Sequence, residues 1–165
     1  QQKAVSIDYT SHTSGYSSRE IAPFALVNDG LRWHIRAFDR KSKEFRDFVI
    51  TRVLKSQLIE DSQILHNEQS AADIQWNRIV ELDLIPHPNQ EHLEIIENDY
   101  GMTGGVLHLK LRAAVSGYVL RQWIVDCSSE HSLQGKEYRL WLRNHLALYS
   151  VSSAKLAPGY EFPEV

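Results

Sequence analysis

The sequence predicts an α+β protein, in which a small antiparallel β-barrel or rolled sheet is followed by an α/β sandwich. In the first 60 residues, short segments that alternate apolar and polar residues are separated by turn sequences, as in small antiparallel sheets. After residue 76, such segments are interspersed with others whose apolar residues recur every three or four positions. This second pattern is typical of strands that alternate with helices.

The two parts of the chain also differ in charge. Residues 1–60 contain ten Lys and Arg and seven Asp and Glu, which gives +3, whereas residues 61–165 contain eight and fourteen, which gives −6. This asymmetry indicates two modules with different roles. The basic excess is too small for general binding of duplex DNA. We expect a barrel over residues 1–60, a linker over residues 61–75 and a second module over residues 76–165.

Turn residues mark the expected strands of the first module. Pro23 lies inside the second strand and implies an edge position or a β-bulge, because proline has no N–H to donate. Asn28-Asp29-Gly30 is a typical hairpin sequence, since Asp-Gly accepts the positive φ that a tight turn requires. The expected strands cover residues 3–10, 19–27, 31–38 and 44–53.

The strand at residues 31–38 is expected to have a basic face. Successive side chains of a strand point to opposite sides. One side therefore carries Leu31, Trp33, Ile35 and Ala37, and the open side carries Arg32, His34 and Arg36. Two guanidiniums around an imidazole form a surface suited to an anion. The alternative interpretation is an ordinary solvated strand face.

The second module is expected to have the order strand, helix, strand, helix, strand. Its second helix is predicted from the four-residue spacing of Val115, Val119, Trp123 and Cys127, which places them on one face. Gly101 is a plausible C-cap of the first helix. The tail adds one more strand at residues 147–151 or packs back on the first module. The expected strands cover residues 79–85, 106–112 and 137–143, and the helices residues 89–100 and 113–127.

Nothing in the sequence points to catalysis or to a cofactor. There is no nucleophile-elbow pattern and no glycine-rich phosphate loop after a strand, and the eight histidines show no i, i+4 pair of the kind that binds zinc. The single cysteine, Cys127, is expected to be a small core residue. We therefore expect no enzyme and no metal. We also expect no membrane span, since no run of about 18 apolar residues occurs. Cysteine usage fits a cytoplasmic location.

Residues 31–53, LRWHIRAFDRKSKEFRDFVITRV, resemble the signature of WYL domains, which occur in bacterial transcription regulators. The defining Trp-Tyr-Leu falls on Trp33-His34-Ile35, with histidine in place of tyrosine. Taken together, the matches resemble one subgroup, the WYL repressors that accompany anti-phage defence islands of the BREX- and CBASS-associated kind. The further matching segments are Ile7–Ser11, Arg19–Pro23, Arg46–Arg52, Pro86–Pro88 and Asp99–Met102.

The resemblance implies an Sm-like β-barrel over residues 1–60 that senses a nucleotide or a short nucleic acid, and a C-terminal homodimerisation module. It also implies that operator DNA is bound by a winged helix-turn-helix outside this sequence. The chain begins with Gln1 and its single methionine is Met102, so we expect a piece of a longer polypeptide. Transferred position by position, the implied ligand pocket consists of Tyr9, Ser11, Arg19, His34, Arg36 and Arg52.

Two alternatives to a ligand-sensing repressor fragment stay open. An Sm-like barrel can bind single-stranded nucleic acid constitutively, which needs only a local groove. The fragment can also be a purely structural dimerisation piece. Of the six pocket residues, the alternation of the chain itself supports only the shared face of His34 and Arg36.

Overall fold

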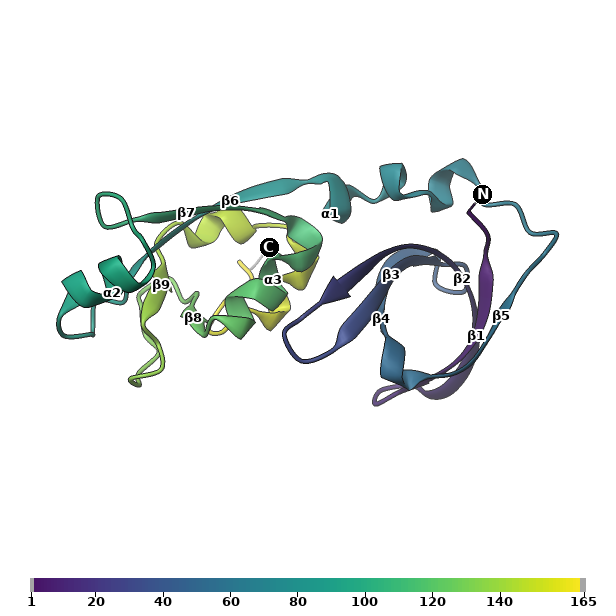
Figure 1. Ribbon diagram of the computed structural model, residues 1–165, viewed down its shortest axis with the longest axis horizontal. Coiled ribbons are helices and arrows are strands. Elements are labelled where there is room, and N and C mark those ends of the chain that lie inside the picture. The colour runs from purple at the N-terminus through teal and green to yellow at the C-terminus, as the bar shows by residue number, and fades with distance from the viewer. Residues whose placement is uncertain (1, 164–165) are drawn as a thin grey trace. The chain divides into compact units, whose positions relative to one another are not determined.

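The computed structural model describes residues 2–163 and divides into two compact units, Gln1–Ile74 and Gln75–Val165 (Figure 1). Both units are built mainly from antiparallel strands with few helices. The predicted α+β class is therefore confirmed.

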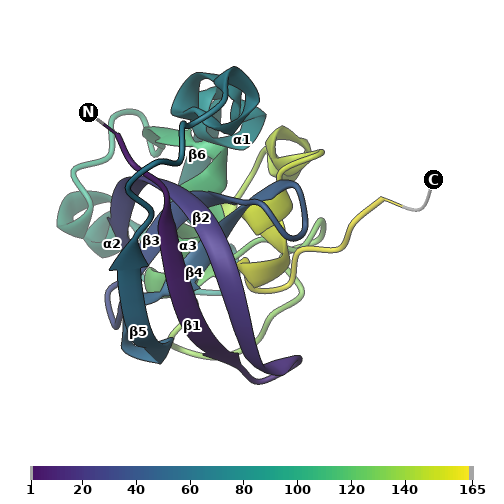
Figure 2. The ribbon, with the colours of Figure 1, turned by 90° about the vertical axis from the view of Figure 1, so that its right-hand side faces the viewer.

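The first unit is a five-stranded antiparallel sheet with the strand order β4-β3-β2-β1-β5. The central strands β1 and β2 run side by side, with β5 on the other side of β1 (Figure 2). The turn after β1 occupies only residues 12–14, because the Ser11 hydroxyl accepts the N–H groups of Thr13 and Ser14. The strands are β1 Val5–Ser11, β2 Gly15–Asn28, β3 Trp33–Asp39, β4 Glu44–Val49 and β5 Val53–Leu58.

The β-bulge and the tight turn of this sheet lie at the proline and the glycine from which they were predicted. The β2–β3 register shifts between Pro23 and Ala25, which confirms the predicted bulge at this proline. In the following turn the Asn28 side chain accepts the N–H of Gly30, whose φ is 88°. Glycine adopts this left-handed conformation without steric cost, and the chain reverses into β3.

The sheet of the first unit is curled (Figure 1), and its core side chains lie on one of its faces. The core consists of Ile7, Tyr9, Ile21, Ala37 and Phe48. The expected single strand over residues 44–53 is interrupted by a 3-10 turn, η1 (Ile50–Arg52), after which β5 pairs with β1. Among residues 2–163 no pairing joins β4 to β5, so closure into a barrel stays a prediction.

Strand β3 contradicts the expectation of an open basic face. Ala37 belongs to the core, as expected, but Trp33 is 52% exposed. His34 and Arg36 are instead almost fully buried. Sequence periodicity failed here because these polar groups are paired with carboxylates, and pairing makes burial of charge tolerable.

Residues 60–74, which we call the connecting segment, follow β5 and form short helical turns. The turns are η2 (His66–Glu68), η3 (Ser70–Ala72) and the start of α1 (Ile74–Asn77). The Glu68 and Asp73 side chains are buried. Because a buried carboxylate needs a partner, the segment is tied to the unit by specific contacts.

The second unit contains a four-stranded sheet with the order β7-β6-β9-β8, in which β8 and β9 are parallel. The predicted alternation of strands and helices is confirmed. The strand expected at residues 147–151 is wrong, because this region forms two 3-10 helices that pack on the core, η4 (His145–Leu148) and η5 (Ser152–Leu156). The other elements are β6 Ile79–Pro86, α2 Leu93–Asp99, β7 Leu107–Arg112, α3 Ala113–Gln122, β8 Val125–Asp126 and β9 Leu140–Leu142.

Helix α3 is shorter than predicted and buries a different face. It ends at Gln122, and Ile124 takes a left-handed conformation with φ 52°. The buried positions include the small residues Ala113, Ser116 and Gly117. A Cβ on Gly117 would lie 1.9 Å from the Ser153 carbonyl oxygen, so close approach of η5, rather than apolar size, selects this face.

Candidate functional site

The six predicted ligand residues are divided between the two faces of the first sheet. Arg19 pairs directly with Ile7 across β1 and β2, and directly paired residues share a face, so Arg19 lies on the core face together with Tyr9. His34 and Arg36 alternate along β3 with the core residue Ala37 and therefore lie on the opposite face. The sheet does not bring all six residues together.

Tyr9 and Ser11 have structural partners. The Tyr9 hydroxyl oxygen accepts a hydrogen bond from the Val49 N–H at 3.1 Å. Its ring meets Phe48 edge to face with the centroids 5.2 Å apart. The Ser11 hydroxyl caps the turn after β1. Both side chains therefore fix the shape of the sheet around the candidate site.

Arg19 forms an ion pair with Asp39, whose side chain is completely buried. Asp39 also accepts hydrogen bonds from the Lys41 N–H and the Ser42 hydroxyl, both at 3.0 Å. The Arg19 Nε donates to the Ser17 hydroxyl at 3.1 Å. This carboxylate is fully satisfied, which is the condition under which a charge is tolerated away from water.

His34 is hydrogen-bonded to Asp29, with 2.7 Å between Nε2 and Oδ2. The Asp29 carboxylate also accepts the N–H groups of Leu31 and Arg32. Burial raises the pKa of Asp29, but the hydrogen bonds from His34 and from the two N–H groups outweigh burial and lower the pKa to about 2. The turn sequence thus supplies the carboxylate that holds the imidazole.

Arg36 and Arg40 each hold a carboxylate of the connecting segment with two parallel hydrogen bonds. Arg36 donates from Nε and Nη2 to Asp73 at 2.8 and 3.1 Å, and from Nη1 to Asp47 at 3.2 Å. Arg40 donates from Nε and Nη2 to Glu68, both at 2.8 Å. Sequence reasoning missed Arg40 and both acids, since it treated one as a turn residue and the others as part of a linker.

Arg52 differs from the other predicted cations. Its guanidinium makes no hydrogen bond or ion pair with the described residues, while its backbone oxygen accepts from the Thr10 hydroxyl at 3.4 Å. The residue is half-buried in η1. It is therefore a cation that an external anion can reach without displacing an internal carboxylate.

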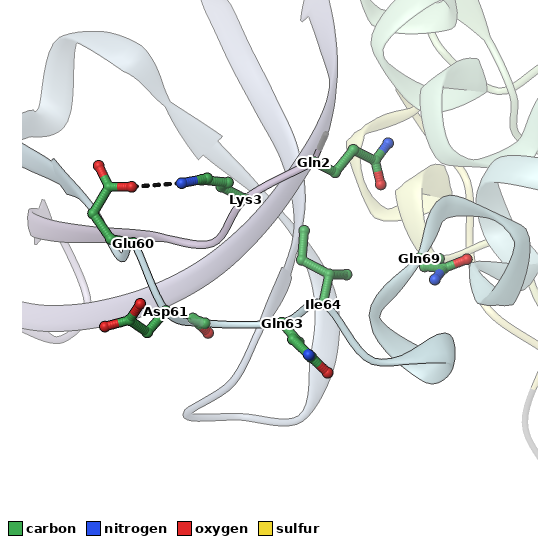
Figure 3. Close-up of a pocket in the computed structure, with 8 residues that line it drawn as sticks. Gln2, Lys3, Glu60, Asp61, Gln63, Ile64 and Gln69 are labelled. Atoms are coloured by element: carbon green, nitrogen blue, oxygen red, sulfur yellow. Dashed lines mark hydrogen bonds and ion pairs between the residues drawn. The ribbon is translucent and has the colours of Figure 1, made fainter.

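A polar cavity of about 690 Å³ lies elsewhere in the first unit (Figure 3). Two of the residues that line it, Lys3 and Glu60, form an ion pair. None of the six predicted residues contributes to its wall, which consists of Gln2, Lys3, Glu60, Asp61, Ser62, Gln63, Ile64 and Gln69.

The described residues contain neither a cluster of metal-binding side chains nor a membrane-spanning helix. No group of three or more His, Cys, Asp or Glu side chains within residues 2–163 is placed to hold a metal ion. In the same range no helix has the length and apolar composition needed to span a membrane. Cys127 lies in the core of the second unit, as expected, and burial raises the pKa of its thiol.

Two protein-family models match this chain. The WYL domain matches residues 1–58, and the C-terminal dimerization domain of the BrxR transcriptional regulator matches residues 79–148. A segment that matches the WYL domain is thus followed by a segment that matches the BrxR dimerization domain, which confirms the predicted resemblance. Each match lies within one of the two compact units.

The chain is homologous to CapW transcriptional repressors. It is 33% identical over 155 residues to the DNA-binding transcriptional repressor CapW of Escherichia coli (strain KTE188), which covers 92% of this chain and 50% of the repressor. It is 39% identical over 106 residues to CapW of Pseudomonas aeruginosa, and this match covers 63% of this chain and 34% of that repressor. The chain spans about half the length of the E. coli relative.

Among solved structures, proteasome accessory factor B/C (PafBC) of Arthrobacter aurescens matches 73% of this chain and 21% of its own, with 14% identity and a TM-score of 0.37. A similarity at this level carries no structural argument.

Proposed function

We propose that this chain is the ligand-sensing and dimerising part of a transcriptional repressor. One observation carries the proposal: the two family matches, to a WYL domain and to a dimerization domain, fall on separate compact units. The CapW relatives are DNA-binding transcriptional repressors. In this proposal the protein regulates transcription, is not an enzyme and acts in the cytoplasm.

The first unit, as an Sm-like barrel, binds a nucleotide or a short nucleic acid. Support comes from the cationic side chains that the resemblance to WYL domains implies as ligands, Arg19, Arg36 and Arg52, of which Arg19 and Arg36 lie on opposite faces of the sheet and do not share one pocket. Two of them are held by carboxylates, and guanidinium groups bind phosphate oxygens with the same geometry as carboxylate oxygens. Arg52 is the accessible starting point for an incoming anion.

The second unit pairs two copies of the chain. It exposes large apolar side chains, among them Trp123 and Ile124 at the end of α3, which are 39% and 41% exposed. Exposed apolar patches commonly mark interfaces. Ile124 combines this exposure with a positive φ of 52°, a strained conformation for a β-branched residue.

Sensing requires that the ligand prefers one arrangement of the dimer over another. A ligand shifts an equilibrium only by the difference in its affinity for the two states. Operator DNA is bound by a DNA-binding domain of the full-length repressor, and the ligand changes operator affinity through the dimer.

The decisive experiment measures operator affinity of the full-length protein with and without hexathymidylate or a nucleotide. We expect a change of about fivefold or more for the wild type, in the range of typical coupling energies. Arg52→Ala is expected to lose this change. Lys55→Ala removes an exposed cation from the same sheet and is expected to keep it. A wild type whose operator affinity no probe alters would contradict the sensor role.

Constitutive binding of single-stranded nucleic acid is a second candidate. Tyr16 and Trp33 expose their rings on the first unit, and exposed aromatic rings stack on bases without sequence preference. Steep salt dependence of hexathymidylate binding, together with unchanged operator affinity, would favour this function over sensing.

A further inference from the structure

The connecting segment is held on the first unit by arginine side chains that project from β3 and the turn after it. Arg40 binds both oxygens of Glu68 and also donates to the Ser62 hydroxyl and to the Gln63 carbonyl oxygen, the latter at 2.8 Å. Four positions earlier, Arg36 binds both oxygens of Asp73. Two bidentate arginine–carboxylate pairs therefore hold the last residue of η2 and the residue after η3.

These pairs have the geometry of a bound phosphate. In each, the two guanidinium N–H groups face two oxygens of one planar anion, an arrangement that phosphate reproduces. The Glu68 hydrogen bond and charge raise the pKa of Arg40, and Arg40 in turn lowers the pKa of Glu68. The carboxylates thus occupy the position that an anionic ligand of these arginines would take.

Replacing the two carboxylates by a phosphate would act on the chain segment that carries them. Glu68 and Asp73 belong to the segment that leads from β5 into α1. A phosphate that replaces them on Arg40 and Arg36 releases this segment from the sheet. The segment is the covalent connection to the second unit, so its release is a means by which ligand binding alters the dimerising part.

We infer that Arg36 and Arg40 form a phosphate-binding site which Glu68 and Asp73 occupy in the absence of ligand, so that the connecting segment is a displaceable latch. This inference rests on the proposed sensing function and adds Arg40 to the ligand-binding residues. Arg36 lies in β3 and Arg40 in the turn after it, and four residues of extended chain span about 13 Å at most. One small anion therefore binds one of the two arginines, whereas a single-stranded nucleic acid with several phosphates binds both.

The test compares the affinity of the full chain for two probes, inorganic pyrophosphate and fluorescein-labelled hexathymidylate. Glu68→Gln removes the competing charge but keeps an oxygen for the Leu65 N–H, which Glu68 accepts at 2.9 Å. We expect it to bind hexathymidylate about tenfold more tightly, because a larger fraction of the chain is then open for binding. Arg40→Lys cannot form the two parallel bonds and is expected to bind about tenfold more weakly.

The matched control is Glu81→Gln, which removes the same charge from an exposed pair with Lys110 in the second unit. We expect its affinity to stay within twofold of the wild type. Equal tightening by Glu68→Gln and Glu81→Gln would show a general charge effect and overturn the latch, while leaving ligand sensing intact. Pyrophosphate binding without hexathymidylate binding would identify a small phosphate as the ligand and support the site at one arginine.

A second measurement does not depend on the probe. Hydrogen–deuterium exchange reports opening of the segment, in which the N–H groups of Gln69 and Asp73 are hydrogen-bonded within the turns. We expect faster exchange over residues 62–73 in Glu68→Gln and not in Glu81→Gln. Unchanged exchange in Glu68→Gln overturns the latch. If faster exchange is observed but neither probe binds any variant, both the phosphate site and the proposed sensing function are refuted.

Discussion

Buried charge in the first unit occurs as pairs in which each member is satisfied by several hydrogen bonds. Arg19 with Asp39 lies on the core face, and Arg36 with Asp73 lies on the other. Removing one member of such a pair leaves an uncompensated charge away from water, which costs about 3–5 kcal/mol. These residues therefore contribute to stability as well as to any ligand site.

The substitution Asp39→Ala tests how much the buried ion pair on the core face contributes to stability. We expect the free energy of unfolding to fall by about 3 kcal/mol, because Arg19 loses its partner and the Ser42 hydroxyl loses its acceptor. Urea unfolding measures the change. The control, Glu44→Ala, breaks the exposed pair with Arg46 and is expected to change stability by less than about 1 kcal/mol. Equal effects would show that burial does not govern these pairs.

Asp29 gives the first unit a dependence on pH. Its pKa is lowered from 3.8 to about 2 in the folded protein, so the folded state favours the charged carboxylate. The resulting stabilisation is present above about pH 4 and is lost as the pH falls towards 2. It amounts to about 2 kcal/mol.

Urea unfolding between pH 2 and pH 7 checks this prediction. The wild type is expected to lose about 2 kcal/mol more than Asp29→Asn over the acid range, because asparagine keeps an oxygen for the Leu31 and Arg32 N–H groups and does not titrate. Parallel pH curves for the two proteins would assign the acid sensitivity to other carboxylates.

At the scale of single elements, the contact between α3 and η5 depends on one glycine. Gly117→Ala would place a methyl group 1.9 Å from the Ser153 carbonyl oxygen, so the two backbones must separate. We expect a loss of about 3 kcal/mol in the free energy of unfolding. Arg121→Ala, at an exposed position of the same helix, is the control and is expected to change stability by less than about 0.5 kcal/mol.

The same helix explains where sequence reasoning ends. Alternation and turn residues predicted most strands of both sheets, because these patterns are local, but β5 and β8 were missed. The face of α3 was wrong, since the small residues that permit close packing, such as Ser116 and Gly117, carry no apolar signal. The predicted exposure of the basic face of β3 was wrong because Asp73, the partner of Arg36, is 37 positions away in the sequence. Contacts of this kind are tertiary, and no spacing indicates them.

At the scale of the whole molecule, the family and the order of its two parts could be predicted, whereas the arrangement of the site could not. The signature around Trp33 identified the WYL domain, and a family match over residues 1–58 confirmed it. The resemblance supplied six ligand residues, but the sheet places Arg19 and Arg36 on opposite faces. All six residues therefore do not line one pocket on this sheet.

For the proposed dimer surface at the end of α3, we predict that one substitution stabilises the isolated chain and weakens the dimer. Ile124 combines 41% exposure with a φ of 52°, and strain of this kind costs about 1–3 kcal/mol. Ile124→Gly removes both the strain and the apolar side chain. The isolated chain is therefore expected to gain about 1 kcal/mol in stability, while the dimer dissociates more readily. Sedimentation measures the shift towards the 19.0 kDa monomer, and urea unfolding of dilute protein measures stability.

Lys43→Gly is the matched control for this experiment. Lys43 is exposed in the first unit and has a similar φ of 57°, so glycine relieves comparable strain without touching the second unit. We expect Lys43→Gly to raise stability and to leave dimerisation unchanged. If both variants weaken the dimer, or if neither does, the strained isoleucine is not part of the interface, and another exposed apolar surface of the second unit must pair the chains.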